Sequence, residues 1–339
     1  MEAWVRASSR RAAWVYPAED DDSAEEARFR NFNRNYFASL HQQERMLADQ
    51  PRVDFYHEMV RRQVRPGDRV IDLGTGTGIL AAWAARAGAA QVWALDHSAI
   101  LSHAKTLAAE NGIEAVEFVA THSTDFTLPE PVDVILHEQM GDFLFDEGMV
   151  RNVCDLRDRL LKPGGRILPS CFELFCEPVQ LRDNRRVPFI WELNVHGFDY
   201  AGMEKSRPQE DDYYRIASCD DGMVARFVSE PEPVLRFDLL TLDERTMSHE
   251  LHYERVVREA GRVDALAVFF RVHADEELSL STDPLDPGRA PHWGYRLLRV
   301  EQNHVEAGER LELTLEVGAW ADSDSWRWSY AVAEPSAAG

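Results

Sequence analysis

The chain has 339 residues, of which 45% are hydrophobic and 28% charged, a composition typical of a soluble protein with room for two domains. Its formal net charge of −22 at pH 7 would repel a phosphate backbone over most of the surface, which argues against a nucleic-acid partner. We expect a cytoplasmic protein without membrane contact, because the sequence shows neither an apolar run of roughly 18 residues nor the apolar core of a secretory signal.

The cysteines, histidines and basic residues bear on redox state, metals and source. Four cysteines occur without a CxxC pair, and the histidines form no HxxxH or HExxH pattern, so we expect reduced thiols and no metal site. Only three of the 37 basic residues are lysine, a bias that GC-rich codons produce and that suggests a bacterial source.

The first part of the chain, residues 1–51, predicts an acidic segment followed by helices. Residues 18–26 are mostly acidic, and a helical pattern then runs from about Phe29 to Val60. Because Pro51 interrupts this pattern, we expect two helices or one broken helix.

Residues 52–169 predict an α/β domain, since strands and helices alternate from residue 66. The pattern predicts strands at 69–73, 91–96, 116–119, 132–136 and 166–168, and helices at 79–86, 98–111 and 150–160. Ser98 is the expected cap of the second helix. This rhythm indicates a Rossmann-like parallel sheet with helices on both faces.

Residues 170–339 predict a second, all-β domain. Segments such as 172–176, 234–239, 265–272 and 311–317 alternate with a period of two, which favours antiparallel strands in a barrel or sandwich. Residues 197–215 fit neither pattern and indicate an excursion from this domain.

The first predicted strand leads into a turn with glycines at 74, 76 and 78. A dinucleotide-binding turn needs glycine at 79, where isoleucine stands. Asp72 before the turn and the alternate glycines instead favour S-adenosylmethionine (SAM), with Asp96 placed to accept the ribose hydroxyls. The alternative is a structural turn followed by a capping aspartate.

The fourth predicted strand leads into the sequence HEQMGDFLFDEG, residues 137–148, which we call the glutamate loop. Glu138 and Glu147 stand nine positions apart among apolar residues, where burial without a cationic partner is costly. Two carboxylates on one loop can hold a planar guanidinium from two sides. The alternative is a pair of solvated surface glutamates.

Together these motifs resemble the protein arginine methyltransferases. The resemblance rests on the glycine turn, Asp96, the glutamate loop, Pro291-His-Trp293 and residues 191–199, and it runs from about Asn35 to Val332. It implies a SAM-binding Rossmann-like domain, an antiparallel β-barrel, and a dimerisation arm at about 197–215. A homodimer that converts SAM to S-adenosylhomocysteine is therefore expected.

The resemblance also implies roles for individual residues. Glu138 and Glu147 become the guanidinium clamp, Arg52 pairs with the SAM carboxylate, and a His292–Asp49 dyad removes the proton. The implied cofactor site comprises Tyr36, Phe37, Met46, Arg52, Asp72, Gly74, Thr75, Gly76, Gly78, Asp96, His97 and Thr124. The implied substrate site comprises Glu138, Met140, Asp142, Asp146, Glu147, Met149, His292 and Trp293.

The sequence departs from the family pattern near the substrate. Pro291 replaces a threonine, Gln139 a tryptophan, and Asp142 and Asp146 replace tyrosines. The two aspartates could meet the α-ammonium of an amino acid, so we expect free L-arginine or a small guanidino metabolite as substrate. A polypeptide arginine is the first alternative; methylation of a different small molecule and an inactive scaffold are the others.

Overall fold

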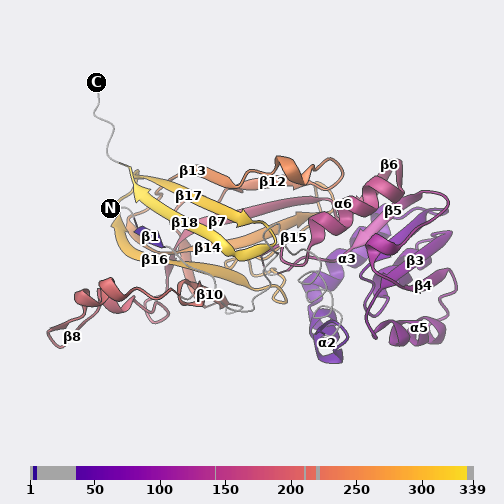
Figure 1. Cartoon of the computed structure of the whole chain (residues 1–339), viewed down its shortest axis with the longest axis horizontal. Helices are drawn as coiled ribbons and strands as arrows, with labels where there is room; N and C mark the ends of the chain where they lie inside the picture. The colour runs from indigo at the N-terminus through magenta and orange to yellow at the C-terminus, as the bar shows by residue number, and fades with distance from the viewer. Residues whose placement is uncertain (1–2, 6–35, 142, 210, 219–221, 334–339) are drawn as a thin grey trace, which may run out of the picture.

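The computed structural model describes residues 3–5, 36–141, 143–209, 211–218 and 222–333. The acidic stretch 18–26, Asp142 and Cys219 lie outside the described residues. The molecule is elongated: an α/β unit forms one end, a β unit forms the other, and the helices α2 and α3 lie next to the junction (Figure 1). No helix of the described chain is both long and apolar enough to cross a membrane.

The expected break in the N-terminal helical pattern is confirmed. Helix α2 (Leu40–Ala48) ends at Asp49, and helix α3 (Gln50–Gln63) begins directly after it. Asp49 has extended dihedral angles, and its Oδ1 accepts the amide hydrogen of Arg52 at 3.1 Å. Pro51 lies in the first turn of α3, where its missing N–H leaves no hydrogen bond unmade.

The α/β unit contains a five-stranded sheet in the order β4-β3-β2-β5-β6, with every neighbouring pair parallel. This confirms the Rossmann-like prediction. The strand order reverses between β2 and β5, and ligands of open α/β sheets bind at such a reversal, beyond the carboxyl ends of the strands. The elements are β2 (Arg69–Leu73), α4 (Ile79–Arg86), β3 (Gln91–Asp96), α5 (Leu101–Glu110), β4 (Val116–Ala120), η1 (Ser123–Asp125), β5 (Val132–His137), α6 (Met149–Leu160) and β6 (Leu161–Leu168).

The prediction that Ser98 caps the helix after β3 is wrong. Helix α5 begins at Leu101, with Ile100 as its N-cap residue and no side-chain cap. Instead, the backbone amide of Ser98 donates a hydrogen bond to Asp96 Oδ1 at 2.7 Å. The Ser98 hydroxyl is buried and has no hydrogen-bond partner among the described residues.

The β unit contains two antiparallel sheets, as the period-two pattern predicts. One sheet has the order β1-β18-β17-β13, and the other has the order β10-β16-β14-β7-β11, with β12 paired to β7 and β15 to β14. The first described residues, β1, pair with β18, so they belong to this unit and not to the helices that follow them in sequence. The elements are β1 (Ala3–Val5), β7 (Cys171–Leu181), β10 (Arg215–Ser218), β11 (Val224–Phe227), β12 (Leu235–Asp238), η5 (Glu244–Thr246), β13 (Glu250–Val256), β14 (Gly261–His273), β15 (Ser279–Ser281), β16 (Tyr295–Val305), β17 (Arg310–Ala319) and β18 (Asp322–Val332).

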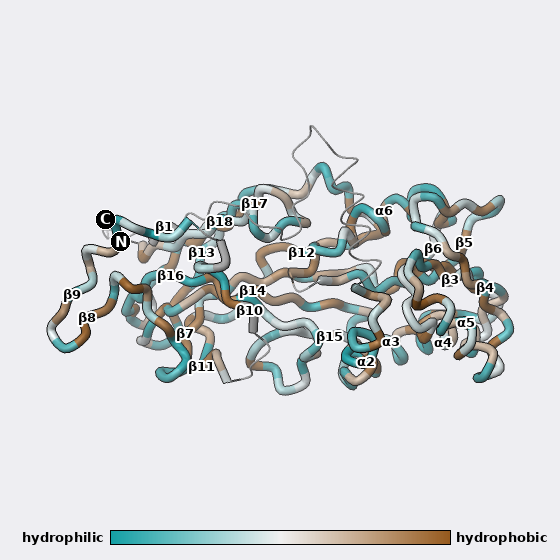
Figure 2. Tube along the Cα trace, turned by 60° about the horizontal axis from the view of Figure 1, so that its bottom comes forward, coloured by the Kyte–Doolittle hydropathy of each residue, from teal (hydrophilic) through white to brown (hydrophobic). Residues whose placement is uncertain are grey.

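One hydrophobic core cluster includes residues of both units, and Figure 2 shows hydrophobic segments in the strands of each. The aromatic residues of the glutamate loop join them. Phe145 packs against Phe237 and Trp320 with ring centroids 5.4 and 4.8 Å apart, and Phe143 lies 5.4 Å from Trp326. Burying such rings stabilises the loop by roughly 1.5–3 kcal/mol each, so the β unit holds the glutamate loop in place.

The excursion expected at 197–215 is present, but its bounds differ. It includes η2 (Ile190–Glu192), the hairpin β8 (Asn194–Val195) and β9 (Phe198–Asp199), η3 (Ala201–Ser206) and η4 (Asp211–Tyr214). Figure 1 shows it projecting from the β unit at the end away from the parallel sheet. Arg215, by contrast, belongs to β10, which pairs with β16. Residues 190–214, which we call the arm, carry exposed apolar side chains that include Val195 and Phe198.

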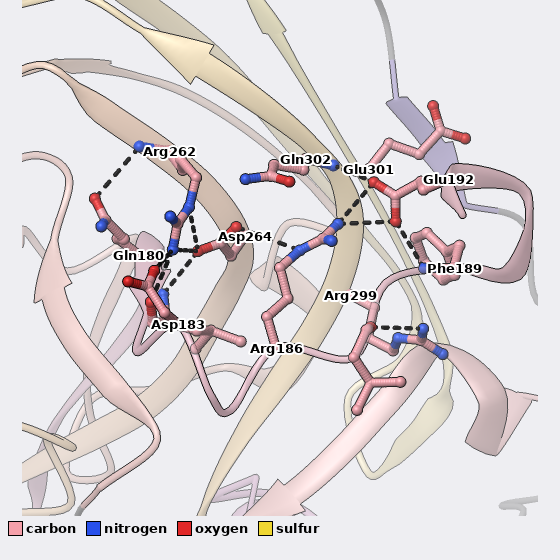
Figure 3. Close-up of polar contacts among 12 residues, drawn as sticks. Gln180, Asp183, Arg186, Phe189, Glu192, Arg262, Asp264, Arg299, Glu301 and Gln302 are labelled. Atoms are coloured by element: carbon pink, nitrogen blue, oxygen red, sulfur yellow. Dashed lines mark hydrogen bonds and ion pairs between the residues drawn. The ribbon is translucent and has the colours of Figure 1, made fainter. Parts of the chain in front are cut away.

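A charged network fixes the base of the arm to the second sheet (Figure 3). Arg186 pairs with Glu192 at 2.7 Å and with the buried Asp264 at 3.3 Å. Asp264 also receives the Nε of Arg262 at 3.4 Å. The Arg299 guanidinium lies 4.1 Å from the centre of the Phe189 ring. These contacts combine charge pairs with a ring contact and are largely shielded from solvent, so they anchor the base of the arm.

Candidate active site

A cavity of about 130 Å³ lies at the point where the strand order reverses. Its walls come from the carboxyl ends of β2, β3 and β5, from residues 121–123 after β4, and from the first turn of α6. Helix α2 contributes Gln43, Met46 and Leu47 from the other side. The predicted site residues that line it are Phe37, Met46, Arg52, Gly74, Thr75, Gly76, Asp96, His97, Glu138 and Glu147.

The glycine turn comes directly after β2 and packs against the end of β3. The amides of Gly74 and Thr75 both donate to the carbonyl of Leu95, at 3.0 and 2.9 Å. Gly76 has a φ of 54°, and a Cβ atom there would lie 3.1 Å from the Gln43 side chain. Glycine therefore satisfies both the left-handed backbone and the close approach of α2.

Asp72 lies behind this turn and supports it, although the sequence places it among the cofactor contacts. Its Oδ2 accepts hydrogen bonds from the Thr75 hydroxyl at 2.5 Å and from the Ala81 amide at 3.1 Å. Complete burial raises the pKa of this carboxyl from 3.8 to about 7. The carboxyl thus connects the turn to the start of α4.

Asp96 and the residues after β4 form the opposite wall. Asp96 Oδ2 accepts the Gly76 amide at 3.0 Å, so this carboxylate helps hold the turn while facing the cavity. His97 and His122 lie side by side, with ring centroids 5.5 Å apart. Thr124 does not line the cavity; its hydroxyl lies 2.9 Å from the Nδ1 of His122, which does. His122 therefore takes the place on the wall that the sequence prediction gave to Thr124.

Some uncharged polar side chains on the wall have buried atoms without a hydrogen-bond partner among the described residues. The hydroxyls of Ser98 and Ser123 and the Oδ1 of Asn152 have no hydrogen-bond partner within the described chain. A buried polar atom without a partner is unfavourable by about 1–3 kcal/mol, so these atoms favour a polar ligand.

The glutamate loop turns tightly between its two carboxylates. The Leu144 amide donates to the Gly141 carbonyl at 2.9 Å, and Leu144 has a φ of 73°, which is rare for a residue with a side chain. Asp146 Oδ1 accepts the Phe143 amide at 3.0 Å. This carboxylate therefore forms part of the turn, which weakens its expected role toward an α-ammonium group. Glu138 and Glu147 both face the cavity.

Arg52 reaches Glu138 directly. Its Nη2 donates to Glu138 Oε2 at 2.5 Å, and its Nη1 donates to the carbonyl of Met46 at 2.8 Å. The guanidinium lies between the rings of Tyr56 and Trp293, 5.8 and 5.6 Å from their centres. One of the two carboxylates thus has a buried cation beside it.

The expected hydrogen bond between the His292 imidazole and Asp49 is absent from the described structure. Asp49 Oδ2 instead accepts the backbone amide hydrogen of His292 at 2.7 Å, while Oδ1 caps α3. The Nδ1 of His292 is buried without a partner in the described chain, and burial lowers the pKa of this imidazole. Both carboxylate oxygens are occupied by backbone amides, which explains the difference.

Several other predicted site residues lie in the core. Met140 and Met149 are buried in the hydrophobic core, and Trp293 is buried with its indole Nε1 donating to the Met140 carbonyl at 2.6 Å. Tyr36 is 39% exposed and meets the cavity-lining Phe37 edge to face. The positive φ of Gly78, 83°, marks the start of α4 behind the wall.

The sequence analysis did not predict several polar residues that line the cavity about one helical turn from predicted site residues. Arg151 and Asn152 line the cavity four and five residues after Glu147, and Gln43 lies three residues before Met46. Helical spacing of three to four residues would have found Arg151 and Gln43, because such side chains share a face. Gln139 also lines the cavity, next to Glu138.

The chain is similar to known methyltransferases in both sequence and structure. Residues 70–165 match a methyltransferase domain family. The chain is 33% identical to protein arginine N-methyltransferase PRMT10 of Oryza sativa subsp. japonica, over 83% of this chain and 82% of that protein. It is 32% identical to protein arginine N-methyltransferase 6 of Xenopus tropicalis, over 81% and 82%.

Solved structures agree with these matches. The crystal structure of Arabidopsis thaliana protein arginine methyltransferase 10 superposes with a TM-score of 0.70 and 28% identity, over 83% of this chain and 89% of that one. The Trypanosoma brucei PRMT1 enzyme-prozyme heterotetrameric complex with AdoHcy gives a TM-score of 0.70 and 25% identity, over 83% and 88%. These relatives are eukaryotic and lend no support to a bacterial source.

The chain belongs to the protein arginine N-methyltransferase family, and it is a SAM-dependent arginine N-methyltransferase.

Proposed function

We propose that the arginine this enzyme methylates is part of a polypeptide. The chain matches protein arginine N-methyltransferases over more than four-fifths of the length of those proteins. The expectation of free arginine rested on two aspartates beside the clamp. Asp142 lies outside the described residues, and the carboxylate of Asp146 is used by the Phe143 amide. The observation that carries the proposal is therefore the similarity to protein arginine N-methyltransferases, and the hydrogen bond from the Phe143 amide to Asp146 agrees with it.

The walls of the cavity suit SAM. The alternate glycines admit the ligand close to the backbone, and Asp96 is placed at the end of β3 for the ribose hydroxyls. The unpaired atoms of Ser98, Ser123 and Asn152 offer partners to a polar ligand. Arg52, Phe37 and Met46 would close over the methionine portion. SAM, when bound, supplies the methyl group.

We assign the guanidinium clamp to Glu138 and Glu147. An arginine side chain has a pKa of about 12.5–13.8, so its nitrogens are poor nucleophiles at neutral pH. Two carboxylates at its edges would concentrate positive charge away from one terminal nitrogen and hold that nitrogen in line for attack. Orientation and exclusion of water can provide about 7–11 kcal/mol of such a barrier.

The proton released from the methylated nitrogen would pass to a clamp carboxylate. His292 is poorly placed for this role, because it does not line the cavity in the described structure and its imidazole is not bonded to Asp49. Burial also lowers the pKa of the imidazole, which makes it a weaker base. Asp49 instead positions two elements, the start of α3 and the His292 backbone, next to Arg52.

We further propose that the enzyme acts as a homodimer through the arm. Residues 190–214 project from the β unit, and Phe198 and Val195 on their hairpin are 66% and 46% exposed. Exposed apolar groups on a rigidly anchored projection suit a protein interface. We retain the cytoplasm as the expected location.

The test is mass spectrometry after incubation with SAM and either free L-arginine or an arginine-containing peptide. We expect a gain of about 14 Da on the peptide, the mass of one methylene. A gain on free arginine alone would overturn the polypeptide proposal and return Asp142 and Asp146 to substrate recognition.

A further inference from the structure

A second cavity, which we call the flanking cavity, lies on the other side of the glutamate loop. Its volume of about 220 Å³ exceeds the 130 Å³ of the catalytic cavity. One wall consists of Phe145, Gly148, Val150 and Arg151, from the end of the glutamate loop and the start of α6. The opposite wall comes from the β unit, from residues 244–249 and from the hairpin 318–321 between β17 and β18.

The walls of the flanking cavity are mainly apolar. Phe145, Val150, Met247 and Trp320 are all buried in the hydrophobic core and yet line this space. The rings of Phe145 and Trp320 lie 4.8 Å apart. Apolar cavities with a few polar groups are the usual form of binding sites for organic ligands. An aliphatic or aromatic side chain therefore suits this space.

The indole of Trp320 supplies a polar group without a partner. Trp320 is 7% exposed, and its Nε1 has no hydrogen-bond acceptor among the residues that the structure describes. Buried indole N–H groups usually donate a hydrogen bond, as those of Trp293 and Trp326 do to the carbonyls of Met140 and Ala319. A peptide carbonyl beside this ring would be a suitable acceptor for the Trp320 donor.

Arg151 connects the flanking cavity to the catalytic one, because its side chain lines both. Gly148, on the flanking wall, directly follows the clamp residue Glu147. The two cavities therefore share a wall residue. Since consecutive Cα atoms are about 3.8 Å apart, the residues one or two positions from an arginine in the clamp lie within about 8 Å of its Cα, and these neighbours are the candidates for the flanking cavity.

The charged residues that line the flanking cavity favour an uncharged side chain. Glu244 and Arg151 have opposite signs, and the Nδ1 of the nearby His249 lies 2.8 Å from the Val317 carbonyl. This combination of charges therefore gives the cavity no electrostatic preference for a cation or an anion. The acidic surface as a whole would attract a basic polypeptide, but this cavity selects among its apolar residues.

We propose that the flanking cavity binds an apolar side chain of the substrate polypeptide, one or two residues from the arginine that enters the clamp. This inference rests on the proposed polypeptide substrate. The bound side chain contacts Phe145 and Gly148, on either side of Glu147 in the chain, and it thereby fixes the loop that carries the clamp. Specificity for sequence arises beside the arginine and not in the clamp itself.

The test compares substrates that differ only beside the arginine. Steady-state kinetics are measured with peptides carrying either leucine or glycine at the positions flanking one arginine, and with N-acetyl-arginine amide, which has no neighbours. We expect KM to be roughly ten- to a hundredfold lower for the leucine peptides, as burial of one leucine side chain implies. The kcat values should be similar.

Two variants alter the cavity in different ways. Ala321→Leu fills it, and Trp320→Phe removes the N–H while keeping an aromatic ring. Ala321→Leu should abolish the preference for leucine, and Trp320→Phe should raise KM for the peptides about three- to tenfold. Both should leave KM for N-acetyl-arginine amide and the Kd for SAM unchanged. Ala331→Leu, near the far end of β18, the strand that begins directly after Ala321, is the matched control and should retain the preference.

Different results test the flanking cavity and the methylation of polypeptides. Equal KM values for leucine and glycine peptides with the natural enzyme would overturn the flanking cavity as a binding site while polypeptide methylation stands. A leucine preference that survives in both cavity variants would also overturn it. Methylation of free arginine and of no peptide would refute the proposed function as well.

Discussion

The contact between Arg52 and Glu138 leads to a prediction about Glu138→Gln. The carboxylate of Glu138 is 13% exposed and accepts a 2.5 Å hydrogen bond from Arg52. In the proposed mechanism it also holds the substrate guanidinium. Hydrogen bonds to charged groups contribute about 1.5–3 kcal/mol each, so loss of a two-bond carboxylate contact removes roughly 3–6 kcal/mol of stabilisation. Turnover should fall by about 10²–10⁴.

The same substitution should affect SAM binding in the opposite direction. Arg52 is expected to pair with the SAM carboxylate, and in the structure it is already paired with Glu138. Removing the negative charge of Glu138 leaves Arg52 more available to the cofactor. We therefore expect the Kd for SAM to stay the same or to decrease, by up to about tenfold, although the clamp is lost.

The assay combines isothermal titration with SAM and a single-turnover methylation rate on an arginine peptide. Glu58→Gln is the matched control, because Glu58 lies on α3, pairs with Arg61 and Arg62 outside the cavity, and should change neither quantity. A turnover within tenfold of the natural enzyme would refute the clamp. A Kd for SAM that increases more than tenfold would refute the competition for Arg52.

Three further predictions concern His292, Asp72 and the arm. His292→Asn should lower kcat/KM by less than about tenfold and leave its pH dependence unchanged; a loss of 10²–10⁴, typical of a general base, would restore the dyad. Because the pKa of Asp72 is raised from 3.8 to about 7, the folded state binds the extra proton between these values. The free energy of unfolding relative to Asp72→Asn should therefore fall as pH rises from about 4 to about 7, and a flat difference in denaturant titrations would contradict this. Phe198→Ser with Val195→Ser should shift sedimentation from dimer to monomer, whereas Leu285→Ser, at another exposed apolar residue, should not.

Periodicity in the sequence was sufficient for the elements whose residues face a core. The five parallel strands and the two-sheet β unit follow from buried runs and from period-two alternation, and Pro51 marks the first turn of α3. Helix starts were less certain. Asp96 draws the Ser98 amide into its own hydrogen bond, and α5 therefore begins at Leu101. That competition between carboxylates and backbone amides has no periodic signal.

The same competition explains the contacts of three aspartates in the predicted site. The sequence predicts contacts with substrate or cofactor for Asp49, Asp72 and Asp146, because acidic residues near a ligand site are often functional. In the structure each accepts backbone amides or a hydroxyl and shapes a turn. Glu138, by contrast, faces both Arg52 and the cavity. The longer side chain carries its carboxylate past the local amides that a shorter aspartate would meet.

Asp49 links the helices that cover the cofactor to the clamp. It ends α2, caps α3, and holds the His292 backbone beside Trp293, whose ring lies against Arg52. A displacement of α2 would therefore move Arg52 relative to Glu138 through one carboxylate. Asp49→Ala should lower the free energy of unfolding by about 1–2 kcal/mol through loss of the helix cap. It should also raise the Kd for SAM, whereas Glu138→Gln should leave that Kd the same or lower it, because only the loss of Asp49 releases the helices that position Arg52. Equal SAM affinity in Asp49→Ala and the natural enzyme would show that α2 and the clamp move independently.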